Sequence, residues 1–275
     1  MGVIARLEKD EARLFFEQEH LDGAFFRVGG GEVALYSRRS PAKETPNEDA
    51  AGIVATGLDR AVLAVADGLG GAPAGRQASS IAIHCLVEAV QASVREGNEI
   101  RSGILNGFEA ANEKVLALGV GAATTLTAVE LDDGSVRPFH VGDSFMLVTG
   151  QRGKVKMHTI PHSPTGYAVE SELLDEEDAL HHEERHVISN VIGSTDMRID
   201  VGSAFDLSPR DTLLVASDGL SDNLHTLEIV ERIRKGPLKR VTEAIAAEAR
   251  ERMNRESTDA PSKPDDLTFL IFRLA

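Results

Sequence analysis

The 275-residue sequence predicts an α+β sandwich, and three observations lead to this fold class. Apolar segments of strand length follow one another in antiparallel runs, separated by turn signals such as Asp132-Asp133-Gly134. Segments with helical spacing of apolar residues come in two pairs, 74–118 and 226–254, instead of alternating with the strands. No repeat or low-complexity linker divides the chain. A single layered domain therefore fits better than a regular βαβ alternation.

The first half of the chain predicts a lead, two strands and two helices. The first thirty residues are expected to be helical or irregular, ending at Gly29-Gly30-Gly31. "EVALYSRR" reads as a strand, and "AVLAVADG" (61–68) is a continuous apolar run stopped by Asp-Gly, the pattern of a buried strand. Helices are expected over 74–94 and 99–118.

The second half predicts mainly strands, followed by the second helix pair. Residues 124–131 and 136–143 form a hairpin, "FMLVTG" and "KVKMHTI" continue the antiparallel run, and 165–182 is acidic and partly helical. "HVISNVI", "DVGSAFDL" and "DTLLVASDG" are predicted strands. Helices over 226–235 and 237–254 precede a last strand, "LTFLIFRL".

Composition restricts the class of partner. With 42% hydrophobic residues the chain is globular, and no apolar run approaches the roughly 20 residues that a membrane span needs. The first residues lack the apolar core of a signal peptide, and the single Cys85 fits a reducing cytoplasm and a place in the core. There are 29 basic and 44 acidic residues, a net charge of −15. We therefore expect a cytoplasmic protein that binds neither nucleic acid nor membrane, with acids available for divalent cations.

Residues 182–186, "HEERH", match the H-E-x-x-H motif of zinc peptidases. That motif works only within a helix, where both histidines face one way. Here His186 is followed at once by "VISNVI", which is rich in β-branched residues and poor in helix formers. We interpret the segment as a solvated turn that leads into a strand, and a zinc peptidase that uses His182 and His186 is the less favoured alternative.

Acidic residues recur where apolar strands begin or end. Taken singly, an Asp-Gly after a strand is a common turn signal. Gathered at the ends of buried strands, however, aspartates would raise one another's pKa unless cations neutralised them. Mg²⁺ and Mn²⁺ prefer all-oxygen shells, and two such ions can hold a bridging hydroxide and polarise a phosphoryl group. Glycines after Asp67 and Asp218 fit a site crowded with waters. The residues alone therefore predict a two-metal hydrolase of phosphate esters, with candidate acids Glu48, Asp49, Asp67, Asp143, Asp218, Asp222, Asp265 and Asp266.

From about residue 31 to its end, the sequence resembles the metal-dependent serine/threonine protein phosphatases of type 2C, the PPM family. The resemblance implies a four-layer αββα sandwich, with two central antiparallel sheets flanked by helix pairs. It also implies one catalytic domain over 31–275 behind a lead segment, 1–30, and a variable flap over about 145–190. Six segments carry the resemblance in family order: "NEDA", "VADGLGGAPAGRQAS", "ATTLTAV", "HVGDS", "LLVASDGLSDNL" and "DDLTFLIF".

The resemblance implies a role for each acid at the strand ends. They would serve two ions of Mn²⁺ or Mg²⁺, with a third, weaker ion beside them, and the implied catalytic residues are Asp67, Asp49 and Glu48. The water or hydroxide that bridges the ions would attack phosphorus, so no phosphoenzyme would form. The implied ligands are Asp67 as the bridge between two ions, the Gly68 carbonyl at one of them, and Asp218 and Asp265 at the other. Glu48 and Asp49 would act largely through bound waters and through contacts with the residues that bind the ions, and Asp143 and Asp222 would hold the third ion.

The implied substrate is a phosphoserine or phosphothreonine protein, and we expect a monomer. Two departures from the family pattern bear on this. Leu69 stands where many eukaryotic members carry a histidine as general acid, and Glu44 stands where members often carry a phosphate-clamping arginine. Lys43 and Arg39, or Arg38, are the candidates to bind phosphate instead, although a lysine lacks the bidentate fork. Asp266 is expected to be a hydrogen-bonding turn residue.

Two interpretations stay open beside this one. A catalytically silent phosphoprotein-binding regulator on the same fold would explain the missing arginine, whereas the complete set of metal carboxylates favours an enzyme. In the flap, the acidic run Glu170 to Glu177 is compatible with selection of basic phosphopeptides and equally with a solvated helix face.

Overall fold

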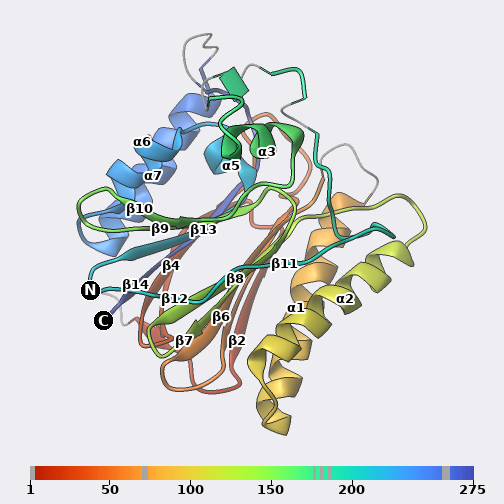
Figure 1. Cartoon of the computed structure of the whole chain (residues 1–275), viewed down its shortest axis with the longest axis vertical. Coiled ribbons are helices and arrows are strands. Elements are labelled where there is room, and N and C mark those ends of the chain that lie inside the picture. Colours follow the sequence, from red (N-terminus) through yellow and green to blue (C-terminus); the bar gives the residue numbers. More distant parts are fainter. Residues whose placement is uncertain (1–3, 70–73, 176–177, 180–181, 185–186, 256–260) are drawn as a thin grey trace.

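Two β-sheets stacked between two helix pairs make up the protein (Figure 1). The computed structural model describes residues 4–69, 74–175, 178–179, 182–184, 187–255 and 261–275. The first sheet pairs antiparallel throughout, except that β1 runs parallel to β3. Its strands are, in spatial order, β1 (Ala5–Arg6), β3 (His20–Val28), β4 (Gly31–Arg38), β14 (Leu267–Leu274), β13 (Thr212–Ala216), β9 (Phe145–Thr149) and β10 (Val155–His158).

The second sheet is antiparallel and carries the other helix pair. Its strands are β11 (Asp200–Val201), β8 (Ser135–Val141), β7 (Leu126–Asp132), β6 (Arg60–Asp67), β5 (Asp49–Ala55) and β2 (Ala12–Phe16), with β12 (Phe205–Asp206) also pairing with β8. Helices α1 (Gly75–Glu96) and α2 (Ile100–Leu116) cover this sheet, and α6 (Thr226–Ile233) and α7 (Leu238–Met253) cover the first. The predicted four-layer α+β sandwich is confirmed.

Three apolar clusters fill the spaces between the four layers. Strand β6 shows how one strand serves two of them: Leu63 and Val65 face the first sheet, whereas Val62 faces α1. Because both faces of the strand are buried, the sequence "AVLAVA" is apolar without alternation. The buried Cys85 belongs to the cluster under α1 and α2, as predicted. Phe269 stacks on Tyr36 in the cluster under α6 and α7.

Residues 4–30, the described part of the lead, are not helical or irregular as predicted, because they form the strands β1, β2 and β3. Strand β2 pairs with β5, and β3 pairs with β4, so this lead contributes to both sheets. Its aromatic residues Phe15 and Phe26 lie 6.1 Å apart between ring centroids and pack against the cluster between the sheets. The antiparallel partners of β2 and β3, namely β5 and β4, lie outside the lead, which explains why the lead by itself carries a weak strand signal.

The segment 187–192, predicted as a strand, pairs with the sheet only through a bridge between Ile192 and Thr124. Polar contacts take its backbone elsewhere: the Ser189 amide donates to the carbonyl of His162, and the Asn190 side chain bonds the backbone of Arg198. β-branched residues favour a strand only where a neighbouring strand is free to pair.

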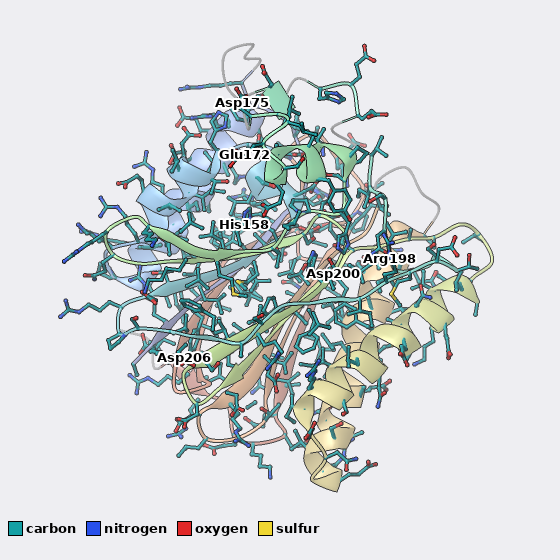
Figure 2. The ribbon with its side chains drawn as sticks, in the orientation of Figure 1. His158, Glu172, Asp175, Arg198, Asp200 and Asp206 are labelled. Atoms are coloured by element: carbon teal, nitrogen blue, oxygen red, sulfur yellow. The ribbon has the colours of Figure 1, made fainter. Side chains whose placement is uncertain are left out.

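Short helices complete the end of the sandwich that carries the acids. Helix α3 (Pro164–Glu170) follows β10, and α5 (Asp218–Ser221) follows β13 directly. Glu172 and Asp175, labelled in Figure 2, follow the end of α3 and are both exposed. Glu176 and Glu177, the end of the acidic run, lie outside the described residues. Of the helices the structure describes, none is long and apolar enough to span a membrane.

Removal of residues 1–30 tests the division into a lead and a domain that begins at residue 31, which stays a prediction. Because β2 covers the edge of β5 and β3 covers the edge of β4, we expect the shortened protein to expose both edges and aggregate. Its melting temperature, followed by circular dichroism, should fall by roughly 10 °C or more. An unchanged melting temperature would show that the lead is dispensable for the fold.

Candidate metal centre

The register of the second sheet brings two predicted acids together. Asp49 begins β5, Asp67 ends β6, and their Cα atoms are direct partners in the antiparallel pair. Opposite residues in such a pair point to the same face, so both carboxylates lie on one face at one end of the sheet. Glu48 precedes Asp49, and its carbonyl accepts a hydrogen bond from the amide of Gly68 at 3.2 Å.

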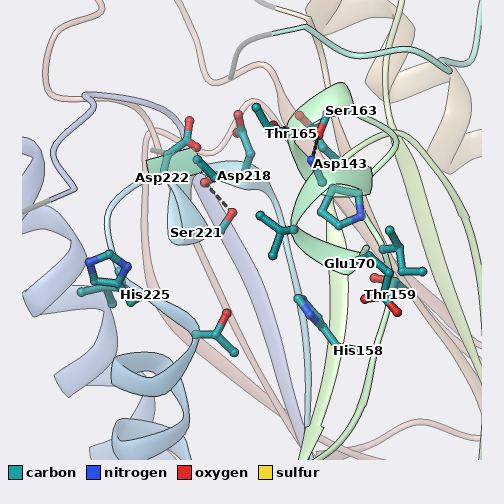
Figure 3. A pocket seen from close by; sticks show the side chains of 17 residues that line it. Asp143, His158, Thr159, Ser163, Thr165, Glu170, Asp218, Ser221, Asp222 and His225 are labelled. Atoms are coloured by element: carbon teal, nitrogen blue, oxygen red, sulfur yellow. Dashed lines mark hydrogen bonds between the residues drawn. The ribbon is translucent and has the colours of Figure 1, made fainter. Parts of the chain in front are cut away.

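The first sheet supplies the remaining acids at the same end of the sandwich. Asp218 is the first residue of α5, directly after β13, and Asp265 precedes β14, the neighbour of β13. Asp222 follows α5. One carboxylate oxygen from each of these three residues lies within 4.8 Å of the others. In Figure 3, Asp143 from the loop after β8 lies with Asp218 and Asp222 around one pocket.

Threonines and serines that had no predicted role fix the backbone beneath these acids. The amide of Asp67 donates to Thr125 Oγ1 at 3.0 Å, and Thr124 Oγ1 donates to the Asp67 carbonyl at 2.7 Å. The Thr125 hydroxyl also bonds Ser144 at 2.7 Å, next to Asp143. The motifs "ATTLTAV" and "HVGDS" thus join Asp67 to Asp143 through buried hydroxyls. Membership of these two motifs was the sequence signal from which a role for Thr124, Thr125 and Ser144 could have been predicted.

The glycines that follow Asp67 and Asp218 are needed for a different reason from the one predicted. A Cβ on Gly68 would lie 2.4 Å from the carbonyl oxygen of Gly75, and a Cβ on Gly219 would lie 1.9 Å from that of Asp266. Both glycines permit a close approach of two backbones, rather than leaving room for waters. They hold α1 and β14 against the turns that carry the acids.

Several buried carboxylate oxygens at this centre have no hydrogen-bond partner. Asp49 is 2% exposed; Ser217 donates to its Oδ2 at 2.9 Å, but its Oδ1 has no partner. Oδ1 of Asp143 and Oδ1 of Asp218 are likewise buried without a partner. A buried oxygen without a donor costs free energy, and these are the hard ligands that Mg²⁺ and Mn²⁺ accept. The donor set therefore fits divalent cations.

The pKa values point the same way. Burial, followed by repulsion from Asp218, raises the pKa of Asp67 well above its usual range, and the same two causes raise the pKa of Asp143. Burial and Asp218 also raise the pKa of Asp222 to about 7. Burial would raise the pKa of Asp218, but the charge of Lys263 and the hydrogen bonds with Lys263, Asp67 and Asp222 together outweigh burial and lower that pKa. Without added cations these acids do not all ionise at neutral pH.

Two lysines contact different carboxylates of this centre. Lys43 Nζ donates to Glu48 Oε2 at 2.6 Å and to Asp266 Oδ2 at 2.9 Å. Asp266, 2% exposed, also accepts the amides of Ser40 and Glu48, as expected of a hydrogen-bonding turn residue. Lys263, which sequence reasoning missed, makes salt bridges to three of the aspartates, namely Asp218, Asp222 and Asp265.

The other phosphate-binding candidate lies further from the acids. Arg39 donates to the carbonyl of Glu44 at 3.1 Å and forms a 3.6 Å ion pair with Glu19. Arg38 pairs with Asp22. Glu44, at the position of the family arginine, is exposed. Of the three cations considered, only Lys43 contacts a carboxylate of the candidate centre.

A pocket of roughly 280 Å³ opens beside the acids, between α3, α5 and the start of α6 (Figure 3). Its carboxylate end is formed by Asp143, Asp218 and Asp222, and its far end by His158 and His225. Apolar side chains also line the pocket, among them Ile160, Val169 and Leu224.

A second group of potential ligands, His140, His162 and Asp200, does not suit a metal. His162 Nδ1 accepts hydrogen bonds from the amide of Gly142 at 3.0 Å and from the Asn190 side chain at 2.9 Å. Its Nε2 therefore carries the proton and donates to Asp200 at 3.1 Å, which leaves no lone pair for an ion. This group instead ties the segment after β10 to the loop that carries Asp143.

The H-E-x-x-H segment forms no helix where the structure describes it. His182 is exposed, and Glu183 and Glu184 form an exposed turn. Arg185 and His186 lie outside the described residues. A turn does not present a histidine and a glutamate on one helical face, so this finding favours the connecting segment over the zinc peptidase.

Comparison with known proteins identifies similar chains. The family model described as protein phosphatase 2C matches residues 38–256. The chain is 30% identical over 212 residues to the protein phosphatase PhpP of Streptococcus pneumoniae, covering 74% of this chain and 85% of that one. It resembles the crystal structure of the PPM Ser-Thr phosphatase MsPP from Mycobacterium smegmatis, in complex with cacodylate, with a TM-score of 0.69, 26% identity, and coverage of 88% and 98%.

The fold also matches the catalytic domain of the serine threonine protein phosphatase PstP in complex with two manganese ions. The TM-score is 0.66 at 21% identity, and the match covers 88% of this chain and 96% of that chain. At this identity the likeness concerns the fold alone.

The stability of the metal-free protein should depend on Asp222 in a defined pH window. Its folded-state pKa of about 7 lies above the unfolded value of about 4, so stability is fully present below pH 4 and is lost as the pH rises through 7. We expect Asp222→Asn to leave the melting temperature at pH 4 unchanged and to raise it at pH 7.5 by roughly 2–4 °C per kcal/mol of repulsion removed. Asp133→Asn, in an exposed turn, is the control. Equal effects at both pH values would contradict the assignment.

Proposed function

The chain belongs to the protein phosphatase 2C family and is a serine/threonine protein phosphatase, and from this premise we propose that it hydrolyses phosphoserine and phosphothreonine proteins at the carboxylates around Asp67. The observation that carries the proposal is the set of buried carboxylate oxygens without donors, on Asp49, Asp143 and Asp218. Together with raised pKa values, they make a site whose charge is balanced only when cations bind.

The proposed ligand set keeps the predicted residues. Asp67 would be shared between two ions of Mn²⁺ or Mg²⁺. Gly68, whose amide donates to the carbonyl of Glu48, would offer its own carbonyl to one of these ions. When bound, the ions would supply a water nucleophile and neutralise the phosphoryl oxygens. The remaining proposed ligands are Asp218 and Asp265 at the other ion, Glu48 and Asp49 largely through waters, and Asp143 and Asp222 at a third ion.

The chain's own residues would position what the ions hold. Ser217 keeps the Asp49 carboxylate in one orientation, and the hydroxyls of Thr124 and Thr125 prevent the Asp67 backbone from shifting. Leu69, directly after Asp67-Gly68, has no ionisable group, so it would not protonate the leaving group. The pocket beside Asp143 and Asp222 is the proposed place for the polypeptide that carries the phosphate. A monomer in the cytoplasm stays our prediction.

Lys43 is the proposed phosphate-binding residue. Its ammonium lies between Glu48 and Asp266, is 27% exposed, and carries a pKa that its two carboxylate partners raise against the opposing effect of burial. It is therefore charged at neutral pH and close to the acids that would hold the ions. Arg39, in contact with Glu19 and the Glu44 carbonyl, is the weaker candidate.

Asp67→Asn tests the proposal directly. We expect wild-type protein to hydrolyse p-nitrophenyl phosphate and a phosphothreonine peptide with Mn²⁺ or Mg²⁺, and the variant to lose at least about 1,000-fold in kcat because the shared ligand is gone. EDTA should have the same effect, and Asp133→Asn should retain full activity. Wild-type protein that binds a phosphopeptide but stays silent with Mn²⁺, Mg²⁺ and Zn²⁺ would favour the phosphoprotein-binding regulator.

Lys43→Met should raise KM for p-nitrophenyl phosphate by roughly tenfold, since a charge-assisted contact to the phosphate is lost. Arg39→Met is the matched control from the same segment, and its KM should change by less than about twofold. Steady-state kinetics with saturating Mn²⁺ measures both. The opposite ranking would assign the phosphate to Arg39.

A further inference from the structure

Lys263 lies at the centre of three carboxylates of the candidate metal centre. Its Nζ is 2.5 Å from Asp222 Oδ2, 2.9 Å from Asp265 Oδ2 and 3.2 Å from Asp218 Oδ2. One oxygen from each of the same three aspartates lies within 4.8 Å of the others, close enough to share a single cation. The ammonium therefore occupies the position that a small cation would take among them.

The backbone of Lys263 is fixed on both sides, so the direction of its side chain is built into the fold. Its amide donates to Asn223 Oδ1 at 3.0 Å, and its carbonyl accepts from Asn223 Nδ2 at 2.9 Å. Asn223 is fully buried and also donates to the carbonyl of Gly219, within the helix that carries Asp218. Asn223 thus sets Lys263 in register with α5.

The ammonium compensates charge that nothing else in its surroundings compensates. Among the described residues, Lys263 is the one hydrogen-bond donor to the Asp222 carboxylate. Oδ1 of Asp218 has no hydrogen-bond partner, whereas Oδ2 of the same carboxylate accepts from Lys263. The two oxygens of Asp218 can therefore serve different cations: Oδ1 is free for an ion, and Oδ2 is held by the ammonium.

We propose that Lys263 is a built-in cation of this centre, and that a divalent ion binds beside Asp222 only by displacing its ammonium. The inference rests on the proposed function, from which it takes the premise that divalent cations bind at these carboxylates. With its side chain 27% exposed, Lys263 can swing toward solvent on a flexible stem without any change in the backbone clamp. The two ions proposed at Asp67 can use Oδ1 of Asp218, which Lys263 leaves without a partner, whereas the position beside Asp222 is taken up at much higher metal concentration.

Removal of the ammonium gives two opposite effects in one variant. Lys263→Met leaves three carboxylates uncompensated, so the metal-free variant should melt at a lower temperature than wild type. The same change should strengthen Mn²⁺ binding at the weakest site by at least roughly tenfold, because a unit charge a few ångströms away no longer competes. Isothermal titration calorimetry, checked by the loss of the free-Mn²⁺ signal in electron paramagnetic resonance, measures stoichiometry and affinity. Differential scanning calorimetry measures stability, with and without Mn²⁺.

Two further variants make the test specific. Lys239→Met removes an exposed lysine of α7 that pairs only with Glu243, and should change neither measurement. Lys263→Arg keeps the charge and should retain weak binding at the third position, and it also serves if the methionine variant does not fold. An identical Mn²⁺ isotherm for wild type and Lys263→Met, or for Lys263→Met and Lys263→Arg, would overturn the proposal.

Failure of this inference is distinguishable from failure of the proposed function. Metal binding is measured without a substrate, whereas Asp67→Asn addresses turnover. Tighter Mn²⁺ binding by Lys263→Met in a protein that hydrolyses no phosphate would support the built-in cation and reject the phosphatase mechanism. Normal turnover of phosphate esters, with Mn²⁺ binding that Lys263→Met leaves unchanged, would support the phosphatase mechanism and reject the built-in cation.

Discussion

Repulsion among buried carboxylates is the constraint on which the rest of this site depends. Asp49, Asp67, Asp143, Asp218 and Asp265 lie close enough to shift one another's pKa, in surroundings that water reaches poorly. Charges of one sign at this density cost free energy in any protein unless cations or protons compensate them. The polar contacts nearby are consequently concerned less with the carboxylates than with the backbone beneath them. Thr124 and Thr125 hold the Asp67 backbone in place against that repulsion, whereas Ser217 donates to the Asp49 carboxylate itself.

The sandwich creates the crowded position because it aligns ends of strands from two sheets. In the second sheet, pairing in register sets Asp49 opposite Asp67. In the first, the adjacency of β13 and β14 brings Asp218 and Asp265 to the same end. Three apolar layers fix the sheets against each other and against the helices, so the acids cannot relax apart without disturbing the core. Close backbone approach at Gly68 and Gly219 adds a local limit of the same kind.

The sequence predicted the elements and site residues that depend on a local pattern. It failed where the structure of a segment is determined by a partner far away in the sequence. The run "AVLAVADG" identifies β6 and Asp67 because burial on both faces and the Asp-Gly stop are both local. The lead was mispredicted because β2 and β3 form by pairing with β5 and β4, and residues 187–192 were mispredicted because their backbone bonds to His162 instead of a strand. Lys263 carries no local signal at all: its position depends on Asn223, forty residues earlier in the sequence.

The two lysines at the centre, Lys43 and Lys263, are not equivalent. They differ in whether their carboxylate partners have other hydrogen-bond donors. Asp266, a partner of Lys43, also accepts the amides of Ser40 and Glu48, so it remains satisfied if the Lys43 ammonium moves toward an incoming anion. Asp222, a partner of Lys263, has no second donor among the described residues, so the departure of Lys263 leaves a charge that another cation or a proton must compensate. Lys43 is thus free to exchange a carboxylate for a phosphate. Lys263, by contrast, leaves behind a carboxylate that has to take up a cation or a proton in its place.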